Sequence, residues 1–219
     1  MKAILAETFA KNTFAYLPGP YHFYATFETF TRDGKPDGEG SIEKFFAVPG
    51  HLKVIRRFRE HTSTEYFNGG PPSYTDDGSE GSIMSYFVND FLLFPLPPPM
   101  GTARKDLEAS TRQLEDVVLD CASYQFYVNA PTYPANPKEA LCVTRPAQDL
   151  VLTQTLVFSV RYQNFLPFLD RSIPRDISAY EGSVLRCRIH MQQVDQQALD
   201  DQALTPPTNA SPVKPGVEW

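Results

Sequence analysis

The stretch PYHFYATFETFTRDGKPDGEGSIEKFFAVPGHLKVIRRFREHTSTEYFNGG, residues 20–70, decides the fold that we expect for this chain. Apolar and polar residues alternate along it, and a period of two indicates strands with one buried face. Turn residues such as Asp33-Gly34 and Pro49-Gly50 separate the strands. The pattern therefore predicts sequential hairpins and an antiparallel sheet. The expected strands are residues 21–31, 40–48, 51–60 and 63–67.

The remainder of the chain is expected to extend or cover this sheet. Residues 2–12, 83–94 and 102–113 are predicted to be short helices, and residues 70–82 a loop. Further strands are predicted at residues 114–122, 124–128, 139–144, 150–160, 174–177 and 183–194, with a turn-rich insert at 130–137. We expect one domain over residues 1–200 and a proline-rich tail or linker, outside the core, over residues 201–219.

Composition excludes several functional classes. The chain has 219 residues and a net charge of −6, so a whole-protein attraction to nucleic acid is not expected. No run of apolar residues is long enough for a transmembrane segment. The beginning of the chain, MKAILAETFAKNTF, has no secretory pattern. Either the protein is cytosolic, or a leader is absent from this chain.

The sequence offers no catalytic constellation and no metal site. The four histidines are not spaced as helical metal ligands, and neither a serine-hydrolase nor a phosphate-loop motif occurs. We therefore predict no enzyme activity and no cofactor. Lys53, Arg56, Arg57 and Arg59 form a basic run, which is either an anion or headgroup contact or a solvated outer face of the sheet. We favour the solvated face, paired with acids such as Glu28 and Glu43.

Cys121 and Cys142 lie on two predicted strands that a turn-rich insert separates, as in a hairpin. We expect a cross-strand disulfide between them, which suits an oxidising compartment. The alternative is that all three cysteines are reduced. Cys187 lies on the inward face of the last strand and is predicted to be a buried thiol.

The apolar segment 83–94 allows two interpretations. It either fills the core or forms a lid over a concave, aromatic sheet, and such a covered sheet is a natural apolar ligand cavity. The side chains expected to line that cavity are Phe23, Phe27, Val54, Phe58, Phe87 and Phe91.

The order of these elements resembles the LolA/LolB lipoprotein-carrier superfamily. More narrowly, the chain resembles the periplasmic domain that precedes the TonB C-terminal domain in some bacterial envelope proteins. The resemblance covers residues 1–207. The matching pieces are Asn12, the strand after Pro20, Asp33-Gly34-Lys35, Gly40-Ser41-Ile42-Glu43, Asn68-Gly69, the Cys121/Cys142 pair, Ile173-Pro174-Arg175-Asp176-Ile177, Leu199-Asp200-Asp201 and Leu204-Thr205-Pro206-Pro207.

The resemblance implies an α+β, mainly β fold: a curved antiparallel sheet, or incomplete β-barrel, with short helices covering its concave face. It implies a non-enzymatic periplasmic module that binds an acyl chain, a lipoprotein or another apolar ligand. The alternative is a protein-interaction domain of an envelope transport or TonB-type energy-transduction system, with a filled core. The expected partners are therefore an apolar small molecule or lipid, or an envelope protein.

Overall fold

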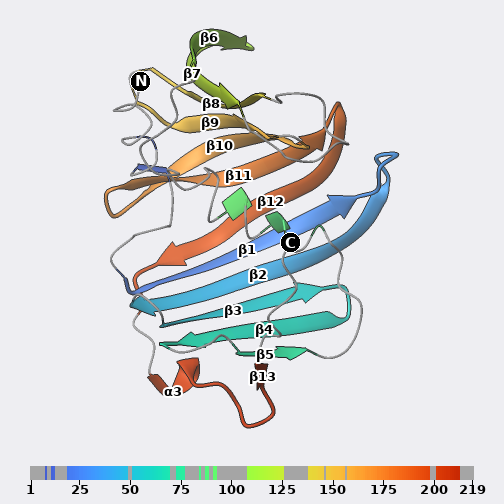
Figure 1. Ribbon diagram of the computed structural model, residues 1–219, viewed down its shortest axis with the longest axis vertical. Coiled ribbons are helices and arrows are strands. Elements are labelled where there is room, and N and C mark those ends of the chain that lie inside the picture. Colours follow the sequence, from blue (N-terminus) through green and yellow to red (C-terminus); the bar gives the residue numbers. More distant parts are fainter. Residues whose placement is uncertain are drawn as a thin grey trace.

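One open antiparallel sheet of 13 strands forms the framework of the protein (Figure 1). The computed structural model describes residues 8, 11–12, 19–48, 51–69, 73–76, 84, 87–88, 91–92, 108–125, 138–145, 147–155, 157–197 and 201–212. The strands are β1 (Tyr21–Phe30), β2 (Pro36–Val48), β3 (His51–Phe58), β4 (His61–Asn68), β5 (Ser73–Asp76), β6 (Glu108–Leu114), β7 (Val117–Gln125), β8 (Lys138–Val143), β9 (Leu150–Gln154), β10 (Ser159–Phe168), β11 (Arg171–Glu181), β12 (Val184–Asp195) and β13 (Ser211–Pro212). A four-residue helix, α3 (Asp201–Leu204), precedes β13.

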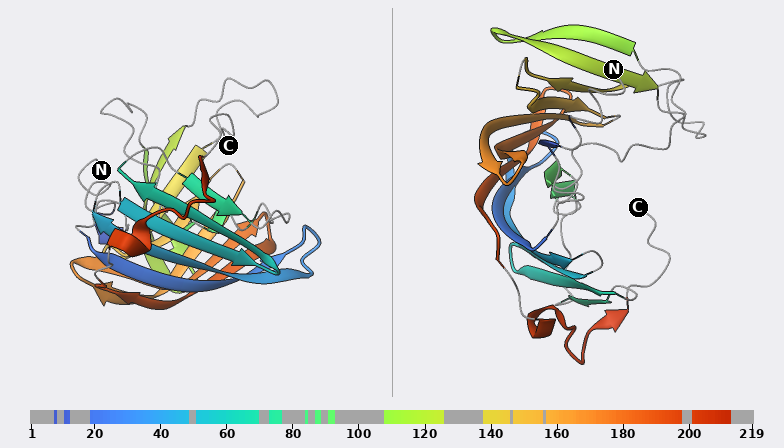
Figure 2. Two further views of the ribbon diagram at one scale, coloured as in Figure 1. Left: turned by 90° about the horizontal axis from the view of Figure 1, so that it is seen from below. Right: turned by 90° about the vertical axis from the view of Figure 1, so that its left-hand side faces the viewer.

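Two meanders meet at the centre of this sheet. The strand order is β13-β5-β4-β3-β2-β1-β12-β11-β10-β9-β8-β7-β6, so only the β1–β12 and β5–β13 neighbours are distant in sequence. The order has two free ends, β13 and β6. Figure 2 shows that the sheet curves strongly, as long twisted strands require. The curved antiparallel sheet is thus present as predicted.

The core lies on the concave side of the curve. Along β1, the side chains of Tyr21, Phe23, Ala25 and Phe27 are buried on one face. They belong to one cluster with residues of β2, β3 and β7–β12 and with the helical residues Met84, Val88, Phe91 and Leu92. The described part of segment 83–94 lies on the concave side in Figure 2. Burial of one face explains the period of two in the sequence.

The first four predicted strands are confirmed as β1–β4, but the predicted loop at 70–82 is wrong in part. Residues 73–76 form β5, which pairs with β4 through Ser63–Tyr66. The short strand was missed because it has no long alternating pattern of its own. Pairing with an existing strand edge supplies its hydrogen bonds.

The predicted helix at 102–113 is also wrong over its described residues. Residues 108–114 form β6, which pairs along its whole length with β7. Nearly every β6 side chain is exposed, so the strand lacks the buried face that produces a recognisable alternation. Pairing with β7, and not the intrinsic secondary-structure preference of residues 108–114, determines that β6 is a strand. Residues 102–107 lie outside the described residues.

Several strand boundaries differ from the prediction because turns were missed. The predicted strand 150–160 is two strands, β9 and β10, joined by a turn in which the Thr155 N–H donates to the Phe158 carbonyl at 2.8 Å. The predicted strands 114–122 and 124–128 are replaced by β6, a turn at Glu115 and the continuous β7. The short strand predicted at 174–177 is the middle of the long β11. The insert 130–137 lies outside the described residues.

Residues near both ends of the chain pack on the sheet. Thr8, Lys11 and Asn12 are helical, and the Asn12 Oδ1 accepts a hydrogen bond from the Leu150 N–H at 3.0 Å. At the other end, α3 contacts β3 and β4, and Leu204 is only 1% exposed. The burial of Leu204 differs from our expectation that this proline-rich segment lies outside the core. The division into a domain and a tail stays a prediction.

Candidate functional site

The predicted cavity residues lie together in the interior of the half-barrel. Phe23, Phe27, Val54, Phe58 and Phe91 are all buried members of one cluster, and Phe87 packs against it partly buried. They come from β1, β3 and segment 83–94. The structure therefore brings the six side chains to one region. Whether they line a ligand cavity stays a prediction.

Gly40 of β2 allows the sheet aromatics to approach each other. It lies opposite Phe27 of β1 and opposite Phe58 of β3, so the two rings flank it. The rings stack with their centroids 6.0 Å apart. A Cβ atom at residue 40 would lie 2.4 Å from Phe27 Cζ and 2.3 Å from the Arg57 carbonyl oxygen. Only glycine fits at this position without displacement of the strands.

A second aromatic group joins segment 83–94 to the far half of the sheet. Phe158, just before β10, lies edge-on to both Phe87 and Phe91, at centroid distances of 5.2 and 5.5 Å. Phe87 and Phe91 stack on each other at 6.1 Å. Edge-to-face and offset stacks of this kind are favourable aromatic arrangements. Phe158 was not among the predicted cavity residues, although its neighbour Val160 marks the same buried face.

Lys44, Arg56 and Glu65 are charged residues on the apolar concave face, and sequence reasoning missed Lys44 and Glu65. Lys44 lies opposite Phe23 and Val54, and Glu65 lies opposite Val54, so both belong to the concave face. Arg56, opposite Ile42, shares that face. The Arg56 Nη2 donates to the Glu65 Oε2 at 3.1 Å. Lys44 lies two residues from both Ile42 and Phe46 on β2, so the alternation along the strand could have predicted that its side chain points to the same face as theirs.

Lys44 is the most buried of the three. Its residue exposure is 7%, whereas the side chains of Arg56 and Glu65 are 14% and 31% exposed. Burial, with a smaller contribution from the positive charge of Arg56, lowers the pKa of Lys44 to about 8. Removal from water destabilises the ammonium form, which explains this direction.

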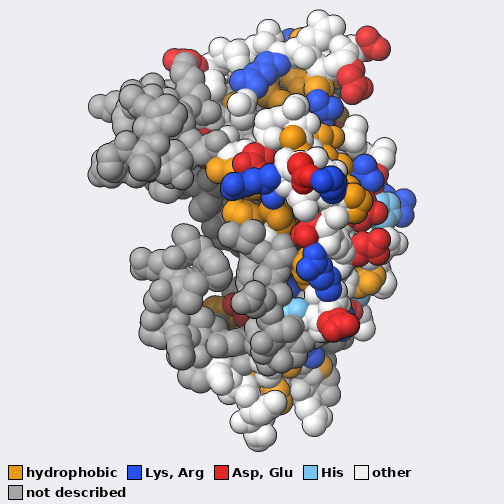
Figure 3. Space-filling view, turned by 90° about the vertical axis from the view of Figure 1, so that its right-hand side faces the viewer, with side chains coloured by type: hydrophobic (Ala, Val, Ile, Leu, Met, Phe, Trp, Pro, Cys, Tyr) orange, Lys and Arg blue, Asp and Glu red, His pale blue; other side chains and the backbone are white. Residues whose placement is uncertain are grey.

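Lys53 and Arg57 lie on the convex face, as the solvated-face interpretation predicts, whereas Arg59 lies in the turn after β3 with its guanidinium over the Phe58 ring. Arg57 pairs with Glu43 at 3.5 Å and Arg59 with Asp37 at 2.7 Å, while the Lys53 ammonium lies over the Tyr66 ring. Figure 3 shows acidic and basic side chains interspersed over the described part of the face that it draws. Exposed pairs of this kind contribute little to stability. Arg56 is the exception, because its side chain points to the interior.

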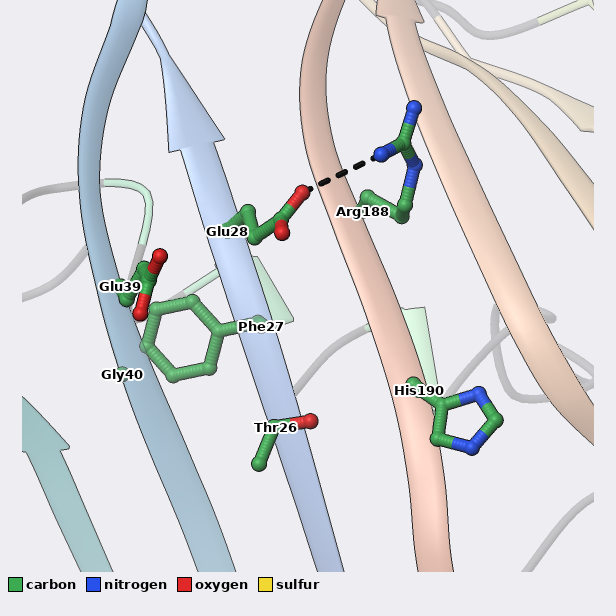
Figure 4. Close-up of a pocket in the computed structure, with 7 residues that line it drawn as sticks. All are labelled: Thr26, Phe27, Glu28, Glu39, Gly40, Arg188 and His190. Atoms are coloured by element: carbon green, nitrogen blue, oxygen red, sulfur yellow. Dashed lines mark hydrogen bonds and ion pairs between the residues drawn. The ribbon is translucent and has the colours of Figure 1, made fainter.

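A pocket of about 310 Å³ lies across β1, β2 and β12 (Figure 4). Thr26 and Glu28 of β1 and Arg188 and His190 of β12 line it, and the Phe27 ring lies beside Glu39 and Gly40 of β2. Glu28 and Arg188 form an ion pair at 3.2 Å across the two strands. Both side chains are about half exposed, so this end of the pocket lies at the solvated surface.

The described histidine–carboxylate pairs also lie on the convex face. The His190 Nδ1 is 2.6 Å from the Asp176 Oδ1, and the His22 Nε2 is 3.2 Å from the Glu43 Oε1. The described residues contain no group of three or more His, Cys, Asp or Glu that is arranged to hold a metal ion. Within the same residues, no helix is long and apolar enough to cross a membrane.

The predicted disulfide is confirmed. Cys121 of β7 and Cys142 of β8 lie directly opposite each other and are joined by an S–S bond of 2.00 Å. They form a small second cluster with Leu119, which the main core does not include. Cys187 is a buried free thiol, as predicted, and burial raises its pKa to about 12.

Comparison with known proteins gives matches in structure but not in sequence. No family model and no curated protein matches the chain. A LolA superfamily protein from Nitrosomonas europaea matches with a TM-score of 0.53 and 13% identity, over 94% of this chain and 97% of that one. A domain described as an outer membrane lipoprotein-sorting protein, from Vibrio parahaemolyticus, matches with a TM-score of 0.56 and 8% identity, over 92% and 94%.

A DUF1329 family protein from Desulfovibrio piger matches with a TM-score of 0.54 and 8% identity, over 93% of this chain and 97% of that one. None of these three descriptions mentions a TonB system, so that part of the expectation stays a prediction. At identities this low, the likeness shows the fold alone. The chain accordingly has the curved open sheet found in LolA superfamily and lipoprotein-sorting structures, along nearly its whole length.

Proposed function

We propose that this protein is a non-enzymatic module of the bacterial envelope that binds an acyl chain, a lipoprotein or another apolar ligand inside its half-barrel. The ligand lies between the concave face of the sheet and segment 83–94, which acts as the cover. Phe23, Phe27, Val54 and Phe58 form the floor of the site. Phe87 and Phe91 form its roof.

The observation that carries this proposal is the aromatic composition of the one apolar cluster to which the floor and the roof both belong. The sheet contributes the stacked pair Phe27–Phe58, and segment 83–94 contributes the stacked pair Phe87–Phe91, within one apolar cluster. Contacts between such surfaces are non-directional. An acyl chain can therefore replace them without leaving a hydrogen-bonding group unsatisfied.

Burial of an acyl chain in this site would release enough free energy for the protein to bind the ligand with micromolar affinity. Each buried methylene contributes about 0.8 kcal/mol. A ligand that buries about ten methylenes gains about 8 kcal/mol, which corresponds to roughly micromolar binding. Displacing the roof from the floor reduces this gain, because the same apolar surfaces lose their contacts with each other.

Two further observations support the assignment. The fold is shared with a LolA superfamily protein and with a domain described as lipoprotein-sorting. The Cys121–Cys142 disulfide suits an oxidising compartment such as the periplasm.

Binding of a fluorescent fatty acid, with lipid extraction of the purified protein, tests the proposal. Phe91→Glu places a charge in the apolar cluster and is expected to weaken fatty-acid binding by about tenfold or more. The matched control is Val118→Glu, because Val118 is 52% exposed on β7. Circular dichroism checks that both variants keep the sheet. The proposal is contradicted if the wild-type protein binds no fatty acid and yields no extracted lipid.

A further inference from the structure

Lys44 is a largely buried cation on the apolar concave face of the sheet. Its neighbours directly across the sheet are Phe23 of β1 and Val54 of β3, both buried. Among the described residues, its ammonium group has no hydrogen-bond or ion-pair partner. Burial of an unpaired ammonium is costly, and most buried charges are paired for that reason.

Arg56 adds a second donor to the same place. It lies diagonally across from Lys44, because Lys44 is opposite Val54 while Arg56 is opposite Ile42. Diagonal neighbours on one face are within reach of long side chains. The Nη2 of Arg56 is engaged by Glu65, but its Nε–H is buried and has no partner among the described residues.

The charges of this group do not balance. Lys44 and Arg56 contribute two positive charges and Glu65 contributes one negative charge, which leaves an excess of one positive charge. Glu65 is committed to Arg56 by their ion pair at 3.1 Å. The excess positive charge is therefore shared by Lys44 and Arg56, which lie diagonally across from each other on the concave face, with the apolar Phe23 and Val54 beside Lys44.

We propose that Lys44 and Arg56 form an anion site within the half-barrel, and that the ligand is an amphiphile whose acyl chain ends in a carboxylate or phosphate. The Lys44 ammonium and the Arg56 Nε–H donate to the anionic oxygens, while the chain lies along Phe23, Val54 and the neighbouring aromatics. This inference rests on the proposed function and adds the charge of the ligand to it.

The surroundings favour an amphiphile over a free ion. Charge-assisted hydrogen bonds are strong in a poorly solvated site. However, a free phosphate loses its hydration on entry and has no apolar part that gains from burial there. An anionic group attached to an acyl chain enters with the favourable burial of that chain. The same site therefore selects both parts of one molecule.

Competition with the neutral dye Nile red tests this inference. Palmitate is expected to displace the dye from the wild-type protein at about tenfold lower concentration than hexadecan-1-ol, which has the same chain without the charge. Lys44→Met is expected to remove this preference, and Lys44→Arg is expected to retain it. Arg57→Met is the matched control, because Arg57 is adjacent to Arg56 but lies exposed on the convex face.

The outcomes of the competition experiment test the anion site and the binding of an apolar ligand separately. Equal displacement by palmitate and the alcohol, or a preference that survives Lys44→Met, contradicts the anion site but leaves apolar binding intact. Failure of both compounds to displace the dye contradicts the proposed function as well. Inorganic phosphate is tested alone by its effect on thermal stability. If it stabilises the protein through Lys44 while palmitate does not bind, the ligand is a small anion and the amphiphile is excluded.

Discussion

The rings of Phe27 and Phe58 stack across an intervening strand, with their centroids 6.0 Å apart, and Gly40 lies between them. This relationship connects the most regular part of the sequence to the candidate site. The two aromatics can extend over β2 because residue 40 has no side chain. The floor of the half-barrel is therefore continuous from β1 to β3.

Replacing Gly40 by alanine is expected to lower the free energy of unfolding by about 2 kcal/mol or more, because the new methyl group collides with the Arg57 carbonyl and the Phe27 ring. Urea unfolding followed by circular dichroism measures the change. Gly182→Ala is the control: residue 182 has a φ of 62° and open space around it, so only backbone strain of about 1 kcal/mol is expected. Equal losses in the two variants would contradict the close packing at Gly40.

The buried position of Lys44 predicts an unusual dependence of stability on pH. Its pKa is about 8 in the folded protein and 10.5 when exposed, so between these values the unfolded chain binds a proton that the folded chain has released. The free energy of unfolding contributed by Lys44 therefore rises with pH in this window, by at most about 3 kcal/mol.

The measurement is the difference in unfolding free energy between wild type and Lys44→Met from about pH 7 to about pH 9.5. The wild-type protein is expected to gain stability relative to the variant as the pH rises. Higher pH is avoided, because burial raises the pKa of Tyr21 and Tyr162, and their ionisation in the unfolded chain then opposes folding. A constant difference across the range would show that Lys44 is solvated in the folded state.

The disulfide predicts the pattern of thiol reactivity. In denaturant without reductant, one of the three cysteines, Cys187, is expected to react with a maleimide, and all three are expected to react after reduction. In the native protein, Cys187 is expected to be unreactive, because its thiol is buried and its pKa is raised.

The double variant Cys121→Ser/Cys142→Ser is expected to lose about 3 kcal/mol of stability, since the bridge closes a loop between residues 21 positions apart. Loss of fatty-acid binding in this variant is not expected while the sheet remains folded, because the disulfide belongs to a separate cluster from the candidate site. Three reactive thiols in the unreduced wild type would contradict the bridge.

Where turns of the first half contain residues that usually mark turns, the strand ends could be predicted. Asp33-Gly34 is one case, and Gly34 adopts a φ of 79° in the β1–β2 hairpin. The β3–β4 turn, with Arg59 at a φ of 55°, lacks such residues, and the predicted strand 51–60 runs through it. The hairpins that were missed have non-glycine residues in the same left-handed region, Glu115 with φ 56° and Leu169 with φ 54°. Such turns depend on strand pairing and not on a local preference, so they leave little signal in the sequence.

Like the fold, the candidate site could be predicted from the sequence only in part. Alternation along β1 and β3 predicted which aromatics point inward, because one buried face imposes a period of two. The same alternation places Lys44 and Glu65 on the inward face. Sequence reasoning overlooked both residues, because charged side chains are ordinarily expected to face solvent. Whether the interior can open depends on how segment 83–94 packs against β1 and β10, which alternation within one strand does not determine.

Photocrosslinking with a palmitate that carries a diazirine in mid-chain, mapped by mass spectrometry, tests the central claim most directly. The account predicts that adducts form on the concave face, at peptides containing Phe23, Phe58 or Phe91, and that unlabelled palmitate prevents them. Adducts confined to the pocket around Thr26 and His190, or no specific adducts at all, would contradict binding inside the half-barrel.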